Sequence, residues 1–162
     1  MSIHTFPTRI SIPADRRGPL VALVNQQLLD LLDLASQTKY AHWNVKGPQF
    51  IALHELFDKL AEELEGEIDD TAERATALGG VAHGTARHVA AGSRLPEFPA
   101  TVFDGLGVVA ALADRFAKVG ESTRAAIDAA DQLGDKDAAD IFTGTSRFLD
   151  KSLWFLEAHL SK

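Results

Sequence analysis

The chain has 162 residues, of which 46% are hydrophobic and 24% charged, so its length suits one domain with a substantial core. Sixteen lysines and arginines against 23 aspartates and glutamates give a formal net charge of −7, which argues against a bare surface that grips nucleic acid or an anionic membrane. The lack of cysteine excludes disulfides, thiolate metal sites and a cysteine nucleophile. No apolar run is long enough to span a bilayer, and residues 1–18 lack an export signal, so we expect a cytoplasmic protein with no membrane partner.

Apolar residues recur at three- and four-residue spacing over four long stretches, which is the period of a helix with one buried face. The first stretch begins at Pro19, which suits a first helical turn, and Gly47-Pro48 stops it. The second runs from about Phe50 to Leu78, the third from about Thr101 to Gln132, and the fourth from about Asp137 to the C-terminus. Alternating β-branched runs are absent. The sequence therefore predicts an all-α fold.

The connections between the predicted helices are unequal in length. The first and second helices, and the third and fourth, are joined tightly enough to form antiparallel hairpins. The segment from Gly79 to Ala100 is too long for a hairpin turn and can travel the length of a bundle, with a short helix over residues 86–91. Two hairpins joined by one long crossover form the ferritin-like four-helix bundle. We therefore expect a tail over residues 1–18 and a bundle domain over residues 19–160.

Two polar pairs on the second predicted helix are candidate metal ligands. His54 and Asp58 are four residues apart, as are Asp69 and Glu73, so each pair shares one helix face. His42 lies near the end of the first helix, and this set of nitrogen and oxygen donors suits iron, manganese or zinc. At about 1.5 Å per residue, the two pairs are separated by about 22 Å. If both serve one metal, two chains must supply them across a twofold axis; without a metal they are an ordinary solvated helix face.

Other short motifs are incomplete. The segment His54-Glu55-Leu56-Phe57-Asp58 has an aspartate where the zinc-protease motif H-E-x-x-H requires a second histidine. Ser36-Gln37-Thr38-Lys39 matches S-x-x-K, but neither S-D-N nor K-T-G follows. The Glu-x-x-His tetrad of metal sites inside a single bundle is also absent, which favours a centre between chains.

Three stretches of the sequence resemble the Dps family (DNA protection during starvation). The first is KYAHWNVKGPQFIALHELFD, residues 39–58. The second is DDTAERA, residues 69–75, followed by Leu78-Gly79-Gly80, and the third is DIFT, residues 140–143, followed by matching segments up to Glu157. The resemblance covers about residues 19–160.

The resemblance implies a homododecameric shell of tetrahedral symmetry, built from twofold dimers around a cavity that stores iron. Family members oxidise Fe(II), preferentially with hydrogen peroxide, at ferroxidase centres between twofold-related subunits. Carried over by position, His42, Asp69 and Glu73 match the catalytic metal ligands given by one subunit. His54 and Asp58 match those given by its twofold partner.

Trp43 matches the family's tryptophan beside this centre, where it would either pass electrons or simply pack. The implied metals are Fe(II) and Fe(III), and zinc or manganese could occupy the same ligands. Peroxide takes two electrons, which two ferrous ions held close together can supply without releasing hydroxyl radical. The sequence therefore predicts an oxidoreductase that consumes peroxide while it sequesters iron.

Aspartates cluster where the third helix meets the fourth: Asp128, Asp131, Asp135, Asp137 and Asp140. Asp137 suits a helix N-cap, and the others suit a solvated face. In shells of the resembling family this region lines threefold pores, so Asp135, Asp137 or Asp140 would draw Fe(II) to a pore mouth. The remaining histidines match no ligand position and are interpreted as surface residues: His4, His83, His88 and His159.

Some members of the family bind DNA through basic tails. Here residues 1–18 carry a net charge of +2 from Arg9, Arg16 and Arg17 against Asp15, which leaves −9 for the rest of the chain. The apolar tail residues suggest packing onto the shell instead: Ile3, Phe6, Ile10 and Ile12. We therefore expect weak direct DNA binding and place a nucleoid-compacting DNA-binding protein second to the iron-oxidising one. A helical scaffold without metal is the third alternative.

Overall fold

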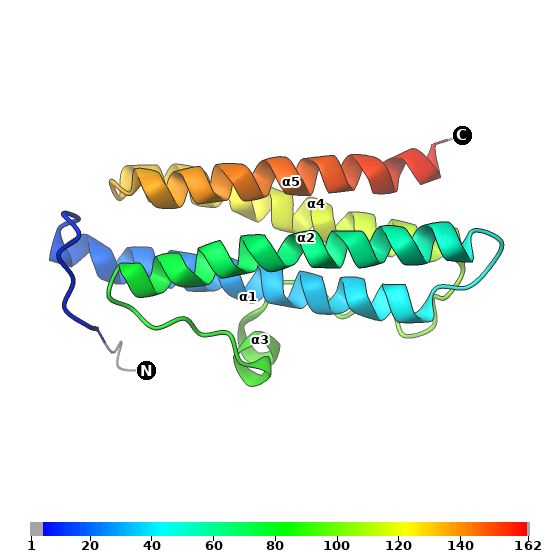
Figure 1. Cartoon of the computed structure of the whole chain (residues 1–162), viewed down its shortest axis with the longest axis horizontal. Coiled ribbons are helices and arrows are strands. Elements are labelled where there is room, and N and C mark those ends of the chain that lie inside the picture. Colours follow the sequence, from blue (N-terminus) through cyan, green and yellow to red (C-terminus); the bar gives the residue numbers. More distant parts are fainter. Residues whose placement is uncertain (1–4, 162) are drawn as a thin grey trace.

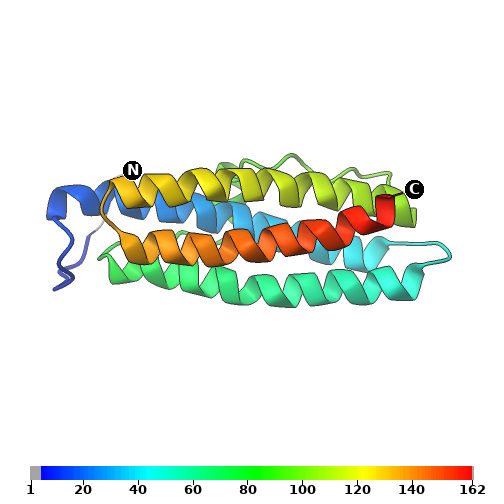
Figure 2. The same ribbon diagram turned by 90° about the horizontal axis from the view of Figure 1, so that it is seen from above.

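The computed structural model describes residues 5–161, which form five helices and, within that range, no strand. The helices are α1 (Ala14–Asn44), α2 (Phe50–Ala77), α3 (Ala86–Gly92), α4 (Gly105–Gln132) and α5 (Lys136–Leu160). The four long helices run side by side, and the short α3 lies outside them (Figures 1 and 2). The predicted all-α fold class is confirmed. Among these helices, none is both long and apolar enough to cross a membrane.

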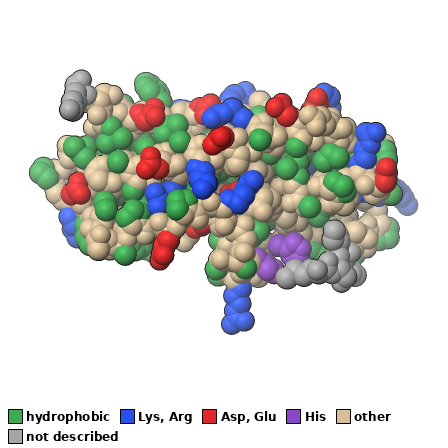
Figure 3. Space-filling view, turned by 180° about the vertical axis from the view of Figure 1, so that it is seen from behind, with side chains coloured by type: hydrophobic (Ala, Val, Ile, Leu, Met, Phe, Trp, Pro, Cys, Tyr) green, Lys and Arg blue, Asp and Glu red, His purple; other side chains and the backbone are tan. Residues whose placement is uncertain are grey.

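Two antiparallel hairpins build the bundle. α1 packs mainly against α2, and α4 against α5, while contacts of α1 with α4 and of α2 with α5 close the bundle. The connection after α2 runs from one end of the bundle to the other and carries α3, which packs on α1 (Figure 1). Figure 3 shows α3 projecting from the molecule, with histidine side chains beside it. This is the single-crossover topology that the connection lengths predicted.

The interior consists of two apolar clusters. The larger is formed by residues of α1, α2, α4 and α5 together with the crossover, and includes the fully buried Phe57 and Phe116. The smaller lies around Leu20 and Phe142. Burial of each of these large side chains stabilises the fold by about 1.5–3 kcal/mol. Both clusters include residues of α1 and α2, so the helices that carry the candidate ligands are held by apolar packing along their length.

The turn between α1 and α2 is fixed by its own contacts. Gly47 has a φ of +116°, a conformation that residues with a side chain rarely adopt. The backbone N–H of Lys46 donates to the carbonyl of Phe103 at 2.7 Å, which ties the turn to the start of α4. Because this turn is short and anchored, the end of α1 and the start of α2 are held side by side.

The first helix begins earlier than predicted. α1 starts at Ala14, so Pro19 lies inside the helix instead of in its first turn. The Arg17 guanidinium donates to the carbonyls of Ile10 and Ile12, both at 2.8 Å, and thus secures the chain that leads into the helix. These side-chain contacts stabilise the start of the helix, while proline within it cannot donate one backbone hydrogen bond.

The start of α4 also differs from the prediction. The expected beginning near Thr101 was four residues too early, because Asp104 caps the helix by accepting a hydrogen bond from the N–H of Gly107 at 2.8 Å. The cap of α5 is Asp135, which accepts from the N–H of Ala138 at 3.1 Å, so the assignment of that cap to Asp137 was wrong. In both helices a carboxylate accepts a hydrogen bond from a backbone N–H of the first turn. The spacing of apolar residues does not show where such a capped end lies.

Candidate metal centre

His42 and His54 lie against each other at the closed end of the first hairpin. His42 is in the last turn of α1 and His54 in the first turns of α2. Their rings are stacked, with centres 3.7 Å apart and planes inclined by 21°. His42 is 8% exposed, whereas His54 is half-buried.

Each of the two histidines is bonded to the backbone of the other. Nδ1 of His42 lies 2.7 Å from the carbonyl oxygen of His54, and Nδ1 of His54 lies 2.8 Å from the carbonyl oxygen of His42. A carbonyl oxygen only accepts, so both Nδ1 atoms must carry the proton. In the neutral rings the Nε2 atoms then hold lone pairs, which is the tautomer a metal ligand needs.

Asp58 completes this group from the next turn of α2. Its Oδ1 atom is 3.8 Å from Nε2 of His42, and the Lys39 ammonium forms an ion pair with the same carboxylate. The hydrogen bond from Lys39 holds the pKa of Asp58 below its ordinary value, with the nearby imidazole of His42 acting in the same direction. The carboxylate is thus ionised and already faces a positive charge.

Asp69 and Glu73 lie on the other half of α2. Both side chains are exposed. Fifteen residues separate Asp69 from His54, about 22 Å along a helix. Within residues 5–161, no three acidic or histidine side chains come close enough together to hold a metal ion. One chain therefore does not bring the five candidate ligands to one place.

The structure groups these candidate ligands differently from the prediction. The prediction placed His42 with Asp69 and Glu73 of one subunit, whereas in the structure His42 stacks on His54. The tight hairpin joins the last turn of α1 to the first turns of α2, far from the second acidic pair. We call His42, His54 and Asp58 one candidate half-site, and Asp69 with Glu73 the other. The contact between the two hairpin ends could have been inferred from the short turn alone.

The family of the chain is shown by comparison with known proteins. A model of the ferritin-like domain matches residues 21–162. The chain is 42% identical over 160 residues to the DNA protection during starvation protein of Agrobacterium fabrum, and the match covers 99% of each. The chain belongs to the Dps family.

Solved Dps structures agree with the fold described above. DpsA14 from Streptomyces coelicolor superposes with a TM-score of 0.94 at 33% identity, covering all of this chain and 96% of that one. A Dps from Mycobacterium smegmatis gives 0.91 at 30% identity, with 97% and 94% covered. The resemblance read from the three sequence stretches is therefore confirmed.

Trp43 directly follows His42 in this Dps chain, but its side chain is far more exposed. Its side chain is 63% exposed, whereas the adjacent His42 is buried. Neighbouring positions on a helix are about 100° apart, so the two side chains leave the helix in different directions. Trp43 is thus an exposed aromatic residue next to the half-site.

The three aspartates predicted for a pore lie in different surroundings. Asp135 is 1% exposed and forms a two-pronged ion pair with Arg74, at 3.0 Å from Nε and 2.5 Å from one terminal nitrogen. Asp137 is exposed and lies 3.3 Å from another nitrogen of Arg74, and Asp140 is exposed. Asp135 is therefore a buried residue of an ion pair, and of these three aspartates only Asp137 and Asp140 are exposed to solvent.

The part of the predicted tail that the structure describes lies on the bundle. The N–H of Phe6 donates to the carbonyl of Gly79 at 2.7 Å, and Ile12 packs on the smaller core cluster. Arg17 is tied to backbone carbonyls, as described above. Of the apolar tail residues predicted to pack onto the protein, Ile12 does so, whereas the side chain of Phe6 is 55% exposed. Ile3 lies outside the described residues, as does His4.

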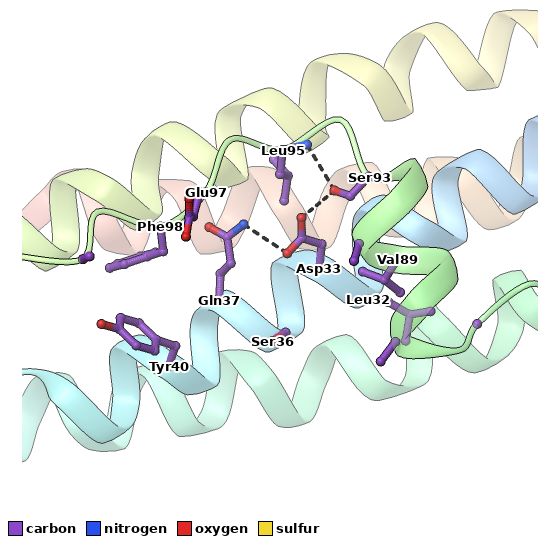
Figure 4. Close-up of a pocket in the computed structure, with 14 residues that line it drawn as sticks. Leu32, Asp33, Ser36, Gln37, Tyr40, Val89, Ser93, Leu95, Glu97 and Phe98 are labelled. Carbon is purple, nitrogen blue, oxygen red and sulfur yellow. Dashed lines mark hydrogen bonds between the residues drawn. The ribbon is translucent and has the colours of Figure 1, made fainter.

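A separate cavity of about 840 Å³ lies between α1, α3 and the crossover (Figure 4). Asp33 lines this cavity and accepts hydrogen bonds from Ser93 at 2.5 Å and from Gln37 at 3.1 Å. Tyr40 and Phe98 face each other at its other end, with ring centres 5.3 Å apart. None of the candidate metal ligands lines this cavity.

Proposed function

We propose that this protein oxidises Fe(II) with hydrogen peroxide, or with oxygen, at centres shared by two subunits, and stores the ferric product in a dodecameric shell. The observation that carries the proposal is the separation on α2: His54 and Asp58 share one half-site with His42, and Asp69 and Glu73 are about 22 Å away. A twofold axis that sets two α2 helices antiparallel would join each half-site to the complementary one of the partner.

The donor set suits this chemistry. The two Nε2 atoms are neutral donors of moderate affinity, and the carboxylates stabilise the ferric product. Two ferrous ions each give one electron, the O–O bond of peroxide breaks, and its two oxygen atoms take up protons and leave as water. Such an activity is that of a ferroxidase-type oxidoreductase. Zinc or manganese could occupy the same ligands at rest.

Two groups near the centre have supporting roles in this proposal. Trp43 would meet the partner subunit or intercept oxidising equivalents, since its ring is exposed beside His42. Asp137 and Asp140 would line the pore through which Fe(II) enters, because both remain exposed while Asp135 is buried. The electrostatic attraction of such a pore should weaken as ionic strength rises.

Protection of DNA would follow from the removal of Fe(II) and peroxide in the cytoplasm. Direct DNA binding, with compaction of the nucleoid, is the second candidate, favoured only by the exposed Arg9 and Arg16. Because Arg17 is engaged with the backbone, the charge free to meet phosphates is smaller than the sequence suggested. A gel shift across ionic strength tests this, and tight binding of plasmid at moderate salt would reverse the order of the two candidates.

Mixed shells test the shared centre. Asp58→Asn and Glu73→Gln shells should each lose peroxide-dependent Fe(II) oxidation. When the two variants are dissociated and reassembled together at random, about one quarter of the centres regain both intact half-sites, and activity should return to that extent. Failure to recover, with a native mass of twelve chains, would show that the ligands do not come from two subunits. Shells of Asp58→Asn mixed with themselves are the control.

A further inference from the structure

His83 and His88 form a pair of imidazoles on the crossover, at the start of α3. Their ring centres are 5.0 Å apart and their planes are nearly perpendicular, at 78°. His83 is exposed and His88 is half-buried. Figure 3 shows histidine side chains at the surface on this side of the molecule. Neither residue is among the candidate ferroxidase ligands, which lie on α1 and α2.

One nitrogen of this pair has no hydrogen-bond partner among the residues that the structure describes. Among residues 5–161, the only buried side-chain nitrogen or oxygen without a hydrogen bond is Nδ1 of His88. Native structures satisfy nearly all such atoms, and a bound water or ion is one of the explanations of an exception. Every other buried polar side-chain atom of the described chain is satisfied, so this nitrogen stands out as a candidate ligand atom.

The spacing of the two rings suits one metal ion. A tetrahedral zinc ion binds imidazole nitrogen at about 2.0–2.1 Å, which places the centres of two such rings about 5 Å apart. The observed separation of 5.0 Å matches this value, so small rotations of the two side chains could direct a nitrogen of each toward a common point.

The backbone on both sides of the pair is anchored. Asn25 of α1 accepts the N–H of His83 at 2.7 Å and donates to the carbonyl of Val81 at 2.9 Å. The N–H of His88 donates to the hydroxyl of Thr85, the N-cap of α3, at 3.4 Å. A ligand pair on fixed backbone loses little conformational entropy when it binds.

We propose that His83 and His88 bind a divalent transition-metal ion, His88 through Nδ1, with water completing the coordination. Imidazole ligands without a carboxylate select zinc, copper or nickel over magnesium and calcium. Each chain would then carry a peripheral metal site besides the ferroxidase centre. The proposal is independent of the proposed function, because it uses none of the same residues.

Zinc binding tests the site in the assembled full-length protein. An Asp58→Asn, Glu73→Gln background removes one carboxylate from each half-site of the other candidate centre. His42, His54 and Asp69 remain in the background and in its derivatives, so the comparison between them isolates the His83–His88 pair. We expect this background to bind about one zinc per chain, with nitrogen neighbours at about 2.0–2.1 Å in the zinc X-ray absorption spectrum. Addition of His83→Ala or His88→Ala should weaken that binding roughly tenfold or more. His159→Ala, an exposed histidine near the end of α5, should leave it unchanged.

Two results would overturn the proposal. The first is a background protein that binds no zinc, which would mean that the rings only pack edge to face. The second is equal zinc affinity in the background and in its His83→Ala derivative. Because His83 is exposed, its replacement should not disturb folding, and circular dichroism with native mass checks this. If His88→Ala misfolds, the His83→Ala comparison alone decides.

Discussion

The two halves of α2 carry their candidate ligands in different ways. At the hairpin end, the groups that would bind metal also hold the structure together, because each histidine donates to the backbone of the other. At the other end, the exposed Asp69 and Glu73 bind nothing that the fold depends on, and the helix is secured behind them by the buried pair Arg74–Asp135. At the hairpin end, the same side chains are therefore candidate metal ligands and structural contacts. At the other end of α2, the candidate ligands and the stabilising ion pair are different residues.

The largest expected effect is a loss of stability when the buried Arg74–Asp135 ion pair is broken. Arg74→Met leaves Asp135 buried without its partner, which should lower the free energy of unfolding by about 3–5 kcal/mol. Arg124→Met is the matched control, because its partner Asp150 is half exposed and such pairs contribute about 0–1 kcal/mol. Chemical denaturation of both variants measures the difference. Equal losses would mean that the burial of the pair contributes nothing.

The next effect distinguishes a residue that would only bind metal from one that also stabilises the fold. His54→Ala and Glu73→Ala should both weaken Fe(II) binding, by roughly 10–100-fold. Only His54→Ala should also destabilise the fold, by about 1 kcal/mol, since it removes a hydrogen bond to the carbonyl of His42. Anaerobic Fe(II) titration and thermal melting give the two quantities. If both variants melt alike, the two ends do not differ in the way described.

A smaller effect is expected at Lys39. Its ammonium pairs with the carboxylate of Asp58 where a metal would bind, so the metal must displace it. Lys39→Met should strengthen zinc binding by up to about tenfold, as a competing charge is removed. Lys59→Met, which breaks the exposed pair with Glu63, is the control. Weaker zinc binding in Lys39→Met would show that the lysine assists the metal.

The smallest effect is the pH dependence of the same pair. Because the pKa of Asp58 is lowered in the folded chain, the stability from its ionised form is fully present above the ordinary carboxyl value of about 3.9. It is lost as the pH falls through the lowered pKa. The difference in melting temperature between the wild type and Lys39→Met should therefore shrink only in strongly acidic solution. A difference that vanishes near neutral pH would contradict this assignment.

Much of the fold could be predicted from apolar spacing and connection length. The bounds of α2 and α3 agreed within one residue with the prediction, because Gly79-Gly80 and the apolar period mark them clearly. The starts of α1 and α4 could not be placed from the apolar period. The start of α1 is secured by Arg17, which binds the carbonyls of Ile10 and Ile12, and the start of α4 is set by the Asp104 cap. The period of apolar residues indicates only which face of a helix is buried. It does not indicate at which residue a capped helix begins.

For the candidate site, the sequence alone determined the residue types and the 22 Å gap that divides them, because helical rise is constant and converts residue number into length. Tertiary structure decided which partners each group has: His42 joins His54, Asp58 meets Lys39, and Asp135 turns inward to Arg74. These contacts join residues of different helices. Their distances depend on how the helices pack and on where the hairpin turns, which no spacing along one helix can specify.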